Sequence, residues 1–141
     1  MLPALLIAAS AFVILALGLV HLLYTFHGPK LLPRDAALQA AMQAVSPQIT
    51  RQTTMWRAWV GFNASHSLGA ILFGAVYGYL ALAQATLLFG SWFLCTLGLA
   101  HLLGYAWLGA RYWFSVPFRG VLLAAGLFAA GLVAQWLRTG V

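Results

Sequence analysis

Two short segments, far apart in the chain, place a histidine in nearly the same apolar context. Residues 17–23 read Leu-Gly-Leu-Val-His-Leu-Leu and residues 97–103 read Leu-Gly-Leu-Ala-His-Leu-Leu, so they agree at six of seven positions. The informative matches are a glycine and a histidine in each segment: Gly18 and His21, Gly98 and His101. Neutral imidazoles from two helices can bind a haem iron axially or share a metal ion with water. The repeat therefore predicts a haem or metal site with His21 and His101 as ligands.

The two glycines agree with this interpretation, because each lies about one helical turn from its histidine. A residue without a side chain lets a flat group or a neighbouring backbone approach closely. Gly18 and Gly98 are therefore candidate cofactor-binding positions. Two other interpretations of the histidines stay open. Each imidazole can bond a backbone carbonyl or a hydroxyl group across a helix interface, or it can transfer protons or contact a substrate.

A second polar group lies in the segment Gly61-Phe-Asn-Ala-Ser-His-Ser67. At about 100° per residue, Asn63 and His66 share one face of a helix, and ionisable residues deep in a membrane span usually face the bundle interior. We expect them to line a pocket for a lipophilic substrate as candidate catalytic residues. Tyr105, one turn after His101, is a third candidate because its hydroxyl can donate a hydrogen bond. Structural hydrogen bonding by Asn63 and His66 is the alternative.

The near absence of acidic residues narrows the chemistry further. Asp35 is the only acidic residue in the chain, and it lies outside the apolar segments. Proton-coupled transporters, Glu-rich di-iron bundles and Ser-His-Asp hydrolases all need a carboxylate in the site. The remaining chemistry is oxidation and reduction, isomerisation or simple ligand binding.

The elements that carry these residues are apolar helices. Of the 141 residues, 64% are hydrophobic and 6% charged, whereas a soluble domain has about 25% charged residues. Apolar segments long enough to span a bilayer lie at about 2–24, 55–82, 86–107 and 118–137. We expect an all-α integral membrane four-helix bundle that forms a single domain over 1–141. The histidine repeat indicates two pseudo-symmetric helical hairpins within this bundle.

The connection between the first two spans should contain a short interfacial helix over about 35–45. Asp35 can act as its N-cap, and Ser46-Pro47 would end it. The apolar residues Leu38, Met42 and Val45 follow helical spacing, which predicts a helix lying in the headgroup plane. This helix could serve as a structural lid on the bundle or as a gate for the substrate, and the sequence leaves both roles open.

The positive charges predict the orientation of the spans. The net charge is +6. Six cations lie in or beside the first and third connections, against Arg138 alone near the end of the chain: Lys30, Arg34, Arg51, Arg57, Arg111 and Arg119. This distribution predicts contacts with lipid headgroups and no nucleic-acid partner, and by the positive-inside rule it places both connections in the cytoplasm. The expected location is a bacterial inner membrane with both termini periplasmic.

Several features of the first third of the chain resemble a known family. They are Thr25-Phe26, Leu32-Pro33 and the stretch Met42-Gln-Ala-Val45, between one apolar helix and the next. This arrangement resembles the small four-helix bacterial membrane proteins grouped as anthrone-oxygenase-like. The resemblance implies an oxygenase that acts on polycyclic aromatic compounds without a demanding metal site. It does not extend to the histidines, so it assigns no catalytic residue.

The sequence thus predicts a small integral membrane protein with an intramembrane histidine site. The favoured function is a cofactor-binding oxidoreductase, or an oxygenase-like enzyme, that acts on a lipophilic small molecule. The alternatives are a non-catalytic membrane subunit or scaffold, and a binding protein for an apolar ligand. The lipid bilayer is the expected surrounding, and assembly into an oligomer or a larger membrane complex stays open.

Overall fold

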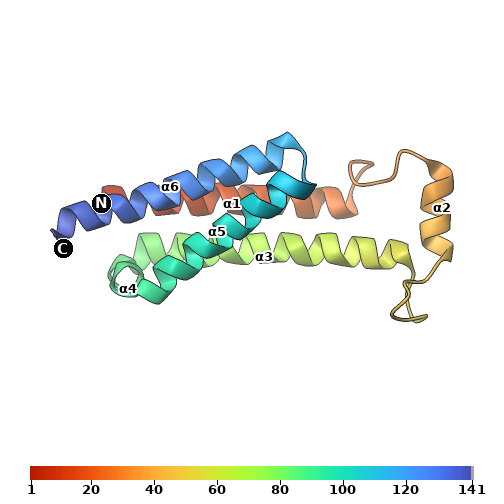
Figure 1. The fold of residues 1–141 in the computed structure, drawn as a ribbon, viewed down its shortest axis with the longest axis horizontal. Coiled ribbons are helices and arrows are strands. Elements are labelled where there is room, and N and C mark those ends of the chain that lie inside the picture. Colours follow the sequence, from red (N-terminus) through yellow and green to blue (C-terminus); the bar gives the residue numbers. More distant parts are fainter. Residues whose placement is uncertain (141) are drawn as a thin grey trace. The chain divides into compact units, whose positions relative to one another are not determined.

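The structure, a computed structural model, describes residues 1–140, and the only regular secondary structure within them is helical. The helices are α1 (Leu2–Phe26), α2 (Ala36–Ala44), α3 (Met55–Ala83), α4 (Ala85–Gly90), α5 (Trp92–Tyr112) and α6 (Ser115–Thr139) (Figure 1). The helices α1, α3, α5 and α6 are long and apolar enough to cross a membrane. The predicted all-α fold with four long apolar helices is confirmed.

Several helix ends follow from local chemistry. The backbone after α1 turns at Gly28, whose φ of +80° lies in the left-handed region that favours glycine. The start of α3 is capped by the Thr54 hydroxyl, which accepts a hydrogen bond from the Arg57 N–H at 3.3 Å. Pro117 lies in the first turn of α6, where a missing N–H costs no helical hydrogen bond.

The third apolar segment differs from the expected single helix over 86–107. The chain instead forms α4, which ends at Gly90, and α5, which begins at Trp92. Between them Ser91 has an extended backbone (φ −111°, ψ 102°), and its side chain accepts a hydrogen bond from the Leu94 N–H at 3.3 Å. A serine hydroxyl that caps a new helix competes with continuation of the old one. The break therefore follows from Ser91 acting as an N-cap.

Contacts divide the chain into two compact units. Unit 1 comprises Met1–Leu17 and Ala70–Val141, and unit 2 comprises Gly18–Gly69. The helices α1 and α3 each contribute one part to each unit. The units are described separately below.

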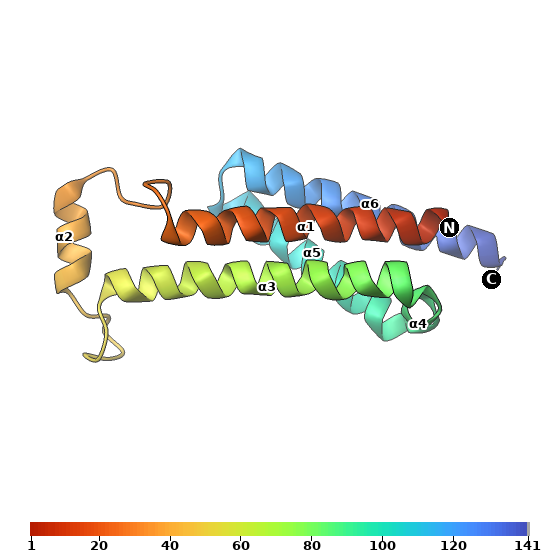
Figure 2. The same cartoon turned by 180° about the vertical axis from the view of Figure 1, so that it is seen from behind.

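Unit 1 is an antiparallel bundle in which α1 and α6 lie side by side. The Ser10 hydroxyl of α1 donates to the carbonyl oxygen of Ala124 on α6 at 2.7 Å, and earlier on α1 Ile7 packs beside Gly131. The residue numbers rise on one helix as they fall on the other, so the two run in opposite directions. The start of α1 and the end of α6 accordingly lie at the same end of unit 1 (Figure 2).

The helices α3 and α5 complete the bundle of unit 1. Gly74 of α3 packs against Ala11 and Leu15 of α1. The Tyr77 hydroxyl of α3 donates to the carbonyl oxygen of Leu94 on α5 at 2.8 Å. Gly98 of α5 in turn lies against Phe128 of α6. Buried side chains from α1, α4, α5 and α6 fill the interior of unit 1: Ile7, Ile14, Leu88, Leu102, Val121 and Phe128 are among them.

The outer faces of the long helices expose large apolar side chains. Phe12 is 68% exposed, Leu72 is 65% exposed and Phe93 is 57% exposed, although each lies within a helix. Such faces are stable in a lipid bilayer rather than in water. The protein is therefore an integral membrane protein whose apolar helices contact lipid.

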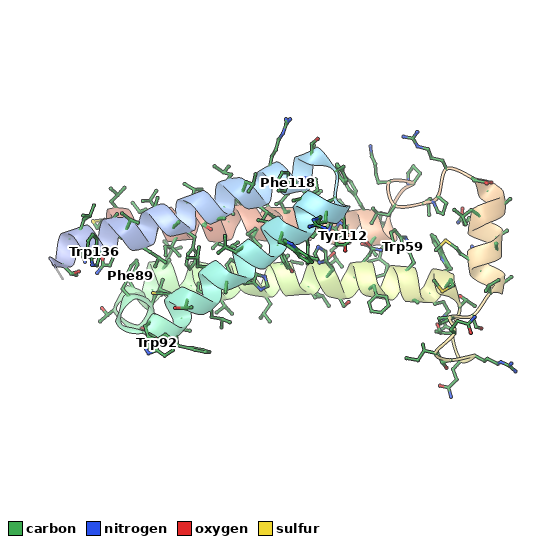
Figure 3. All side chains as sticks on the ribbon, in the orientation of Figure 1. Trp59, Phe89, Trp92, Tyr112, Phe118 and Trp136 are labelled. Atoms are coloured by element: carbon green, nitrogen blue, oxygen red, sulfur yellow. The ribbon has the colours of Figure 1, made fainter. Side chains whose placement is uncertain are left out.

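Aromatic side chains lie toward the ends of the unit 1 bundle. Trp92 and Trp136 lie toward one end and Tyr112 toward the other (Figure 3). These residues are 79%, 62% and 73% exposed, in that order. Tryptophan and tyrosine favour the headgroup level of a bilayer, because one part of the side chain is apolar and the other forms hydrogen bonds. Their placement agrees with helices that begin and end at the membrane surface.

In unit 2 the helix α2 lies crosswise to the adjoining parts of α1 and α3 (Figure 1). As the N-cap, Asp35 accepts a hydrogen bond from the Ala37 N–H at 2.8 Å, and the helix ends at Ala44, before Ser46. None of the residues of α2 is buried, and Leu38 is 51% exposed. The apolar side of α2 is therefore available to lipid, as a helix in the headgroup plane requires.

Candidate functional site

The polar cluster of unit 2 is built around a hydrogen bond between α1 and α3. The ring atom Nε2 of His21 lies 3.1 Å from Oδ1 of Asn63. A histidine and an asparagine that the sequence singled out are thus direct partners. The sequence left the hydrogen-bond partner of Asn63 open.

The orientation of the Asn63 amide determines which atom donates. Its nitrogen Nδ2 donates to the backbone carbonyl oxygen of Trp59 at 2.8 Å, so its oxygen Oδ1 points toward α1. An amide oxygen only accepts, and therefore Nε2 of His21 carries the hydrogen and donates it. In the neutral ring the other nitrogen, Nδ1, then holds a lone pair.

Two hydroxyl groups of the cluster bond their own helices. Thr25 donates to the carbonyl oxygen of His21, and Ser67 donates to that of Asn63, each at 2.8 Å. Bonds from a hydroxyl to the carbonyl of the preceding turn are a common way to satisfy serine and threonine in membrane helices. The imidazole rings are therefore the groups of this cluster best suited to act on a ligand.

The ring of His66 joins the cluster through an edge contact. Its centroid lies 5.4 Å from that of His21, with an angle of 83° between the ring planes. Both histidines are partly exposed. We name His21, Asn63 and His66 the histidine cluster. Two ionisable rings and one amide are thus concentrated within unit 2.

A small hollow adjoins the histidine cluster. It has a volume of about 10 Å³, and Tyr24, Thr25, Trp59 and Asn63 are among the residues that line it. A space of roughly this size can hold about one water molecule. A substrate larger than water would therefore have to reach the rings from their exposed sides.

In unit 1, His101 is part of a stack of rings. It lies parallel to Phe73, with a centroid distance of 4.8 Å and an angle of 10°, and its centroid is 4.4 Å from that of Tyr105. Its atom Nε2 is buried and has no hydrogen-bond partner among residues 1–140. This arrangement places two of the predicted residues, His101 and Tyr105, in direct contact.

The surroundings of the two predicted glycines are also defined. The space beside Gly98 is filled by the rings of Tyr77 and Phe128. Gly18 is buried and belongs to unit 2. Because His21 and Gly18 belong to unit 2 and His101 and Gly98 to unit 1, pairing of His21 and His101 on one haem or metal stays a prediction. Within residues 1–140, groups of three or more His, Cys, Asp or Glu side chains suited to a metal ion are absent.

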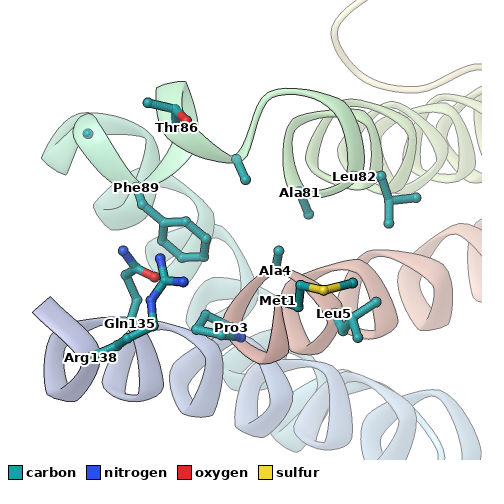
Figure 4. A pocket seen from close by; sticks show the side chains of 12 residues that line it. Met1, Pro3, Ala4, Leu5, Ala81, Leu82, Thr86, Phe89, Gln135 and Arg138 are labelled. Carbon is teal, nitrogen blue, oxygen red and sulfur yellow. The ribbon is translucent and has the colours of Figure 1, made fainter.

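A larger cavity lies elsewhere in unit 1, where the sequence predicted no site. Its volume is about 650 Å³, and Phe89, Gln135 and Arg138 contribute to its lining (Figure 4). One signal in the sequence pointed to it: Gln135 and Arg138 lie three residues apart, on one face of a mostly apolar helix. Sequence patterns alone did not indicate that α4 faces them.

Compared with models of protein families, with curated proteins and with solved structures, the chain shows no significant match.

Proposed function

We propose that the protein is an integral membrane oxidoreductase of the oxygenase type, in which the histidine cluster handles the proton of a lipophilic small molecule. One observation carries the proposal. The His21 ring bonds Asn63, and the amide of Asn63 is itself fixed by the carbonyl oxygen of Trp59. A histidine that is oriented in this way by a second polar group is the usual arrangement of a general base.

The histidine cluster is suited to accept a proton from an acidic C–H or O–H group of an apolar substrate. Nε2 of His21 donates to Asn63, so Nδ1 can accept a proton when the ring is in its neutral form. In the net reaction that the family resemblance implies, a ring CH₂ and O₂ yield a ring C=O and H₂O. The first event is the loss of a proton from the carbon, and an imidazole would accept it. Phenolic and enolisable polycyclic compounds are therefore the favoured substrate class.

The two histidines of the repeat differ in how well each could bind a cofactor. Nε2 of His21 is engaged by Asn63, whereas Nε2 of His101 has no hydrogen-bond partner among residues 1–140. His101 is therefore the stronger candidate for haem or metal binding, with Tyr105 beside it. If His101 binds a haem or metal ion, the histidine cluster still accepts the proton of the substrate.

Removal of the imidazole groups tests the proposal. Membranes that contain the protein are supplied with anthrone, a polycyclic compound with an acidic CH₂ group, and oxygen uptake is measured. We expect His21→Ala and His66→Ala to lower the rate about 10²-fold, a typical contribution of general acid–base catalysis. Asn63→Ala should have a smaller effect, because it removes the orientation but not the base. His27→Ala, at an exposed histidine just after α1, is the matched control.

The same preparations decide the question of a cofactor. A Soret band that is present in the wild-type protein and lost in His101→Ala would support haem ligation. A colourless, metal-free protein with full oxygen uptake would rule out ligation and leave the proton chemistry in place. Oxygen uptake that is unchanged in both His21→Ala and His66→Ala would contradict the proposed function.

A non-catalytic scaffold is the second candidate function, and one observation favours it. The polar groups of Asn63, Thr25 and Ser67 bond partners within unit 2, as residues that only fix helix packing would do. Interhelical hydrogen bonds in membranes contribute only about 0.6 kcal/mol on average. For a scaffold, His21→Ala should therefore lower thermal stability slightly, and the protein should purify with a larger membrane complex.

We also propose that both termini lie on the periplasmic side of a bacterial inner membrane. The cations before and at the start of α3, at the end of α5 and at the start of α6 support this orientation. It predicts that, in a Cys95→Ser background, a membrane-impermeant maleimide labels Thr139→Cys on intact cells but not Gln52→Cys. Both positions are exposed in the fold. Permeabilised cells, in which both should react, are the control, and the reverse pattern on intact cells would contradict the proposed orientation.

A further inference from the structure

The large cavity of unit 1 has the size and walls of a ligand site. It lies where the start of α1, the end of α3, α4 and the end of α6 come together, and its volume is about 650 Å³ (Figure 4). Leu5, Leu82 and Phe89 supply its large apolar side chains, while small residues such as Ala4 and Ala81 leave the space open. Small-molecule sites typically have volumes of about 300–1,000 Å³.

Two polar side chains enter this apolar cavity from a single helix. Gln135 and Arg138 lie three residues apart on α6 and extend toward the ring of Phe89 (Figure 4). The oxygen Oε1 of Gln135 is buried and has no hydrogen-bond partner among residues 1–140. Leaving a buried acceptor unpaired is costly. A ligand with a hydroxyl or N–H group at this point would remove that cost.

The guanidinium of Arg138 has no side-chain carboxylate with which to pair in unit 1. Asp35 is the only acidic residue in the chain, and it belongs to unit 2, where its carboxylate accepts the Ala37 N–H. Arginine stays charged and binds phosphate through two parallel hydrogen bonds. A ligand that fits the cavity therefore carries an anionic group as well as a hydrogen-bond donor and an apolar part.

We propose that this cavity binds an anionic glycerophospholipid of the phosphatidylglycerol type. The phosphate pairs with Arg138, a hydroxyl of the headgroup glycerol donates to Oε1 of Gln135, and an acyl chain lies against Leu5, Leu82 and Phe89. Arg138 is in the last turn of α6, which places its charge at the headgroup level of a membrane-spanning helix. The proposal is independent of the proposed function, because none of the residues of the histidine cluster lines this cavity.

The lipid preference of the wild-type protein tests the proposal without any substitution. The protein in dodecyl maltoside is titrated with dioleoyl phosphatidylglycerol, and bound lipid is counted by native mass spectrometry. We expect it to bind about tenfold more tightly than dioleoyl phosphatidylcholine, which has no net charge. Dioleoyl phosphatidylmethanol has the anionic phosphodiester but no hydroxyl groups, and its affinity should lie between the two. Soluble glycerol 3-phosphate should bind far more weakly than the lipid.

Substitutions then assign each part of the headgroup to a residue. Arg138→Gln should weaken phosphatidylglycerol binding about tenfold, which corresponds to about 1.4 kcal/mol. Arg119→Gln, which removes another exposed arginine of α6, is the matched control and should bind like the wild-type protein. Gln135→Leu should remove the preference for phosphatidylglycerol over phosphatidylmethanol.

Four results would overturn the proposal. They are equal affinity for phosphatidylglycerol and phosphatidylcholine, equal affinity for phosphatidylglycerol and phosphatidylmethanol, glycerol 3-phosphate binding as tightly as the lipid, and equal losses in Arg138→Gln and Arg119→Gln. The first three comparisons need only the wild-type protein, so they test the proposal even if a variant does not fold.

Discussion

A Gly98→Leu protein should unfold at a much lower temperature than the wild-type protein. A β-carbon at position 98 would lie 2.7 Å from Cε1 of Tyr77 and would also overlap Cζ of Phe128. Neither ring can move away easily, because the Tyr77 hydroxyl bonds the carbonyl oxygen of Leu94 and Phe128 is fully buried. Overpacking of a tight core costs about 1–3 kcal/mol or more, and leucine adds three further carbons at this point. We expect a loss of at least about 3 kcal/mol, the upper end of that range.

The measurement is thermal unfolding in detergent, followed by circular dichroism at the helical band. Gly104→Leu is the control on the same helix, since a β-carbon there would meet no atom within 4 Å beyond its chain neighbours and the nearby helix backbone, and the position is exposed. It should unfold close to the wild-type temperature. Gly98→Ala should fall between the two. Similar unfolding temperatures for Gly98→Leu and Gly104→Leu would show that α5 does not pack against Tyr77 and Phe128 as described.

Replacing Phe128 with alanine should give the second large loss of stability. Its ring lies 5.4 Å from that of Tyr77 and 6.5 Å from that of Phe73, measured between centroids, and none of it is exposed. Removing a buried phenylalanine side chain costs about 3–5 kcal/mol in water-soluble proteins. Lipid is as apolar as the bundle core, so the loss arises from missing van der Waals contacts. We therefore expect a value near the lower limit, about 3 kcal/mol.

Exposed phenylalanines provide the comparison for this loss. Phe12→Ala and Phe93→Ala remove the same group from positions that are 68% and 57% exposed. Both should unfold near the wild-type temperature, because lipid fills the space that the ring leaves. Phe128→Leu should lose less than Phe128→Ala, since leucine fills part of the space. Equal destabilisation of Phe12→Ala and Phe128→Ala would contradict the burial of Phe128 in the core.

The helices could be predicted from the sequence because their causes are local. A span in lipid must satisfy its own backbone hydrogen bonds, so about twenty apolar residues in a row already specify a helix. Asp35, Thr54 and Gly28 mark helix ends through bonds or backbone angles within a few residues. The break at Ser91 was missed, because an apolar run on both sides hides one serine, and its effect depends on whether its hydroxyl caps a new helix.

The candidate residues could be selected from the sequence, but their partners could not. Histidines and an asparagine in apolar spans stand out by type alone, and Asn63, His21 and His66 do lie together. That Asn63 bonds His21 of α1 depends on how far α1 and α3 are shifted along each other. The spacing along one helix carries no information on that shift.

The histidine repeat predicted a pair, and the structure gives each member a different environment. His21 is held by an amide, whereas His101 lies between aromatic rings with Nε2 unpaired. Nearly identical neighbours in sequence do not produce identical surroundings, because Asn63 beside His21 and Phe73 beside His101 come from another helix.

The amino-acid sequence by itself determined that this chain enters a membrane, how many times it can cross, and which of its few polar residues are unusual there. Those properties depend on hydropathy and on bonds within a few residues. Only the tertiary structure decided that Asn63 orients His21, that two rings fill the space beside Gly98, and that Gln135 and Arg138 face a cavity next to α4. These arrangements depend on the register and rotation of helices that are distant in sequence, which are set by the packing of all the helices together.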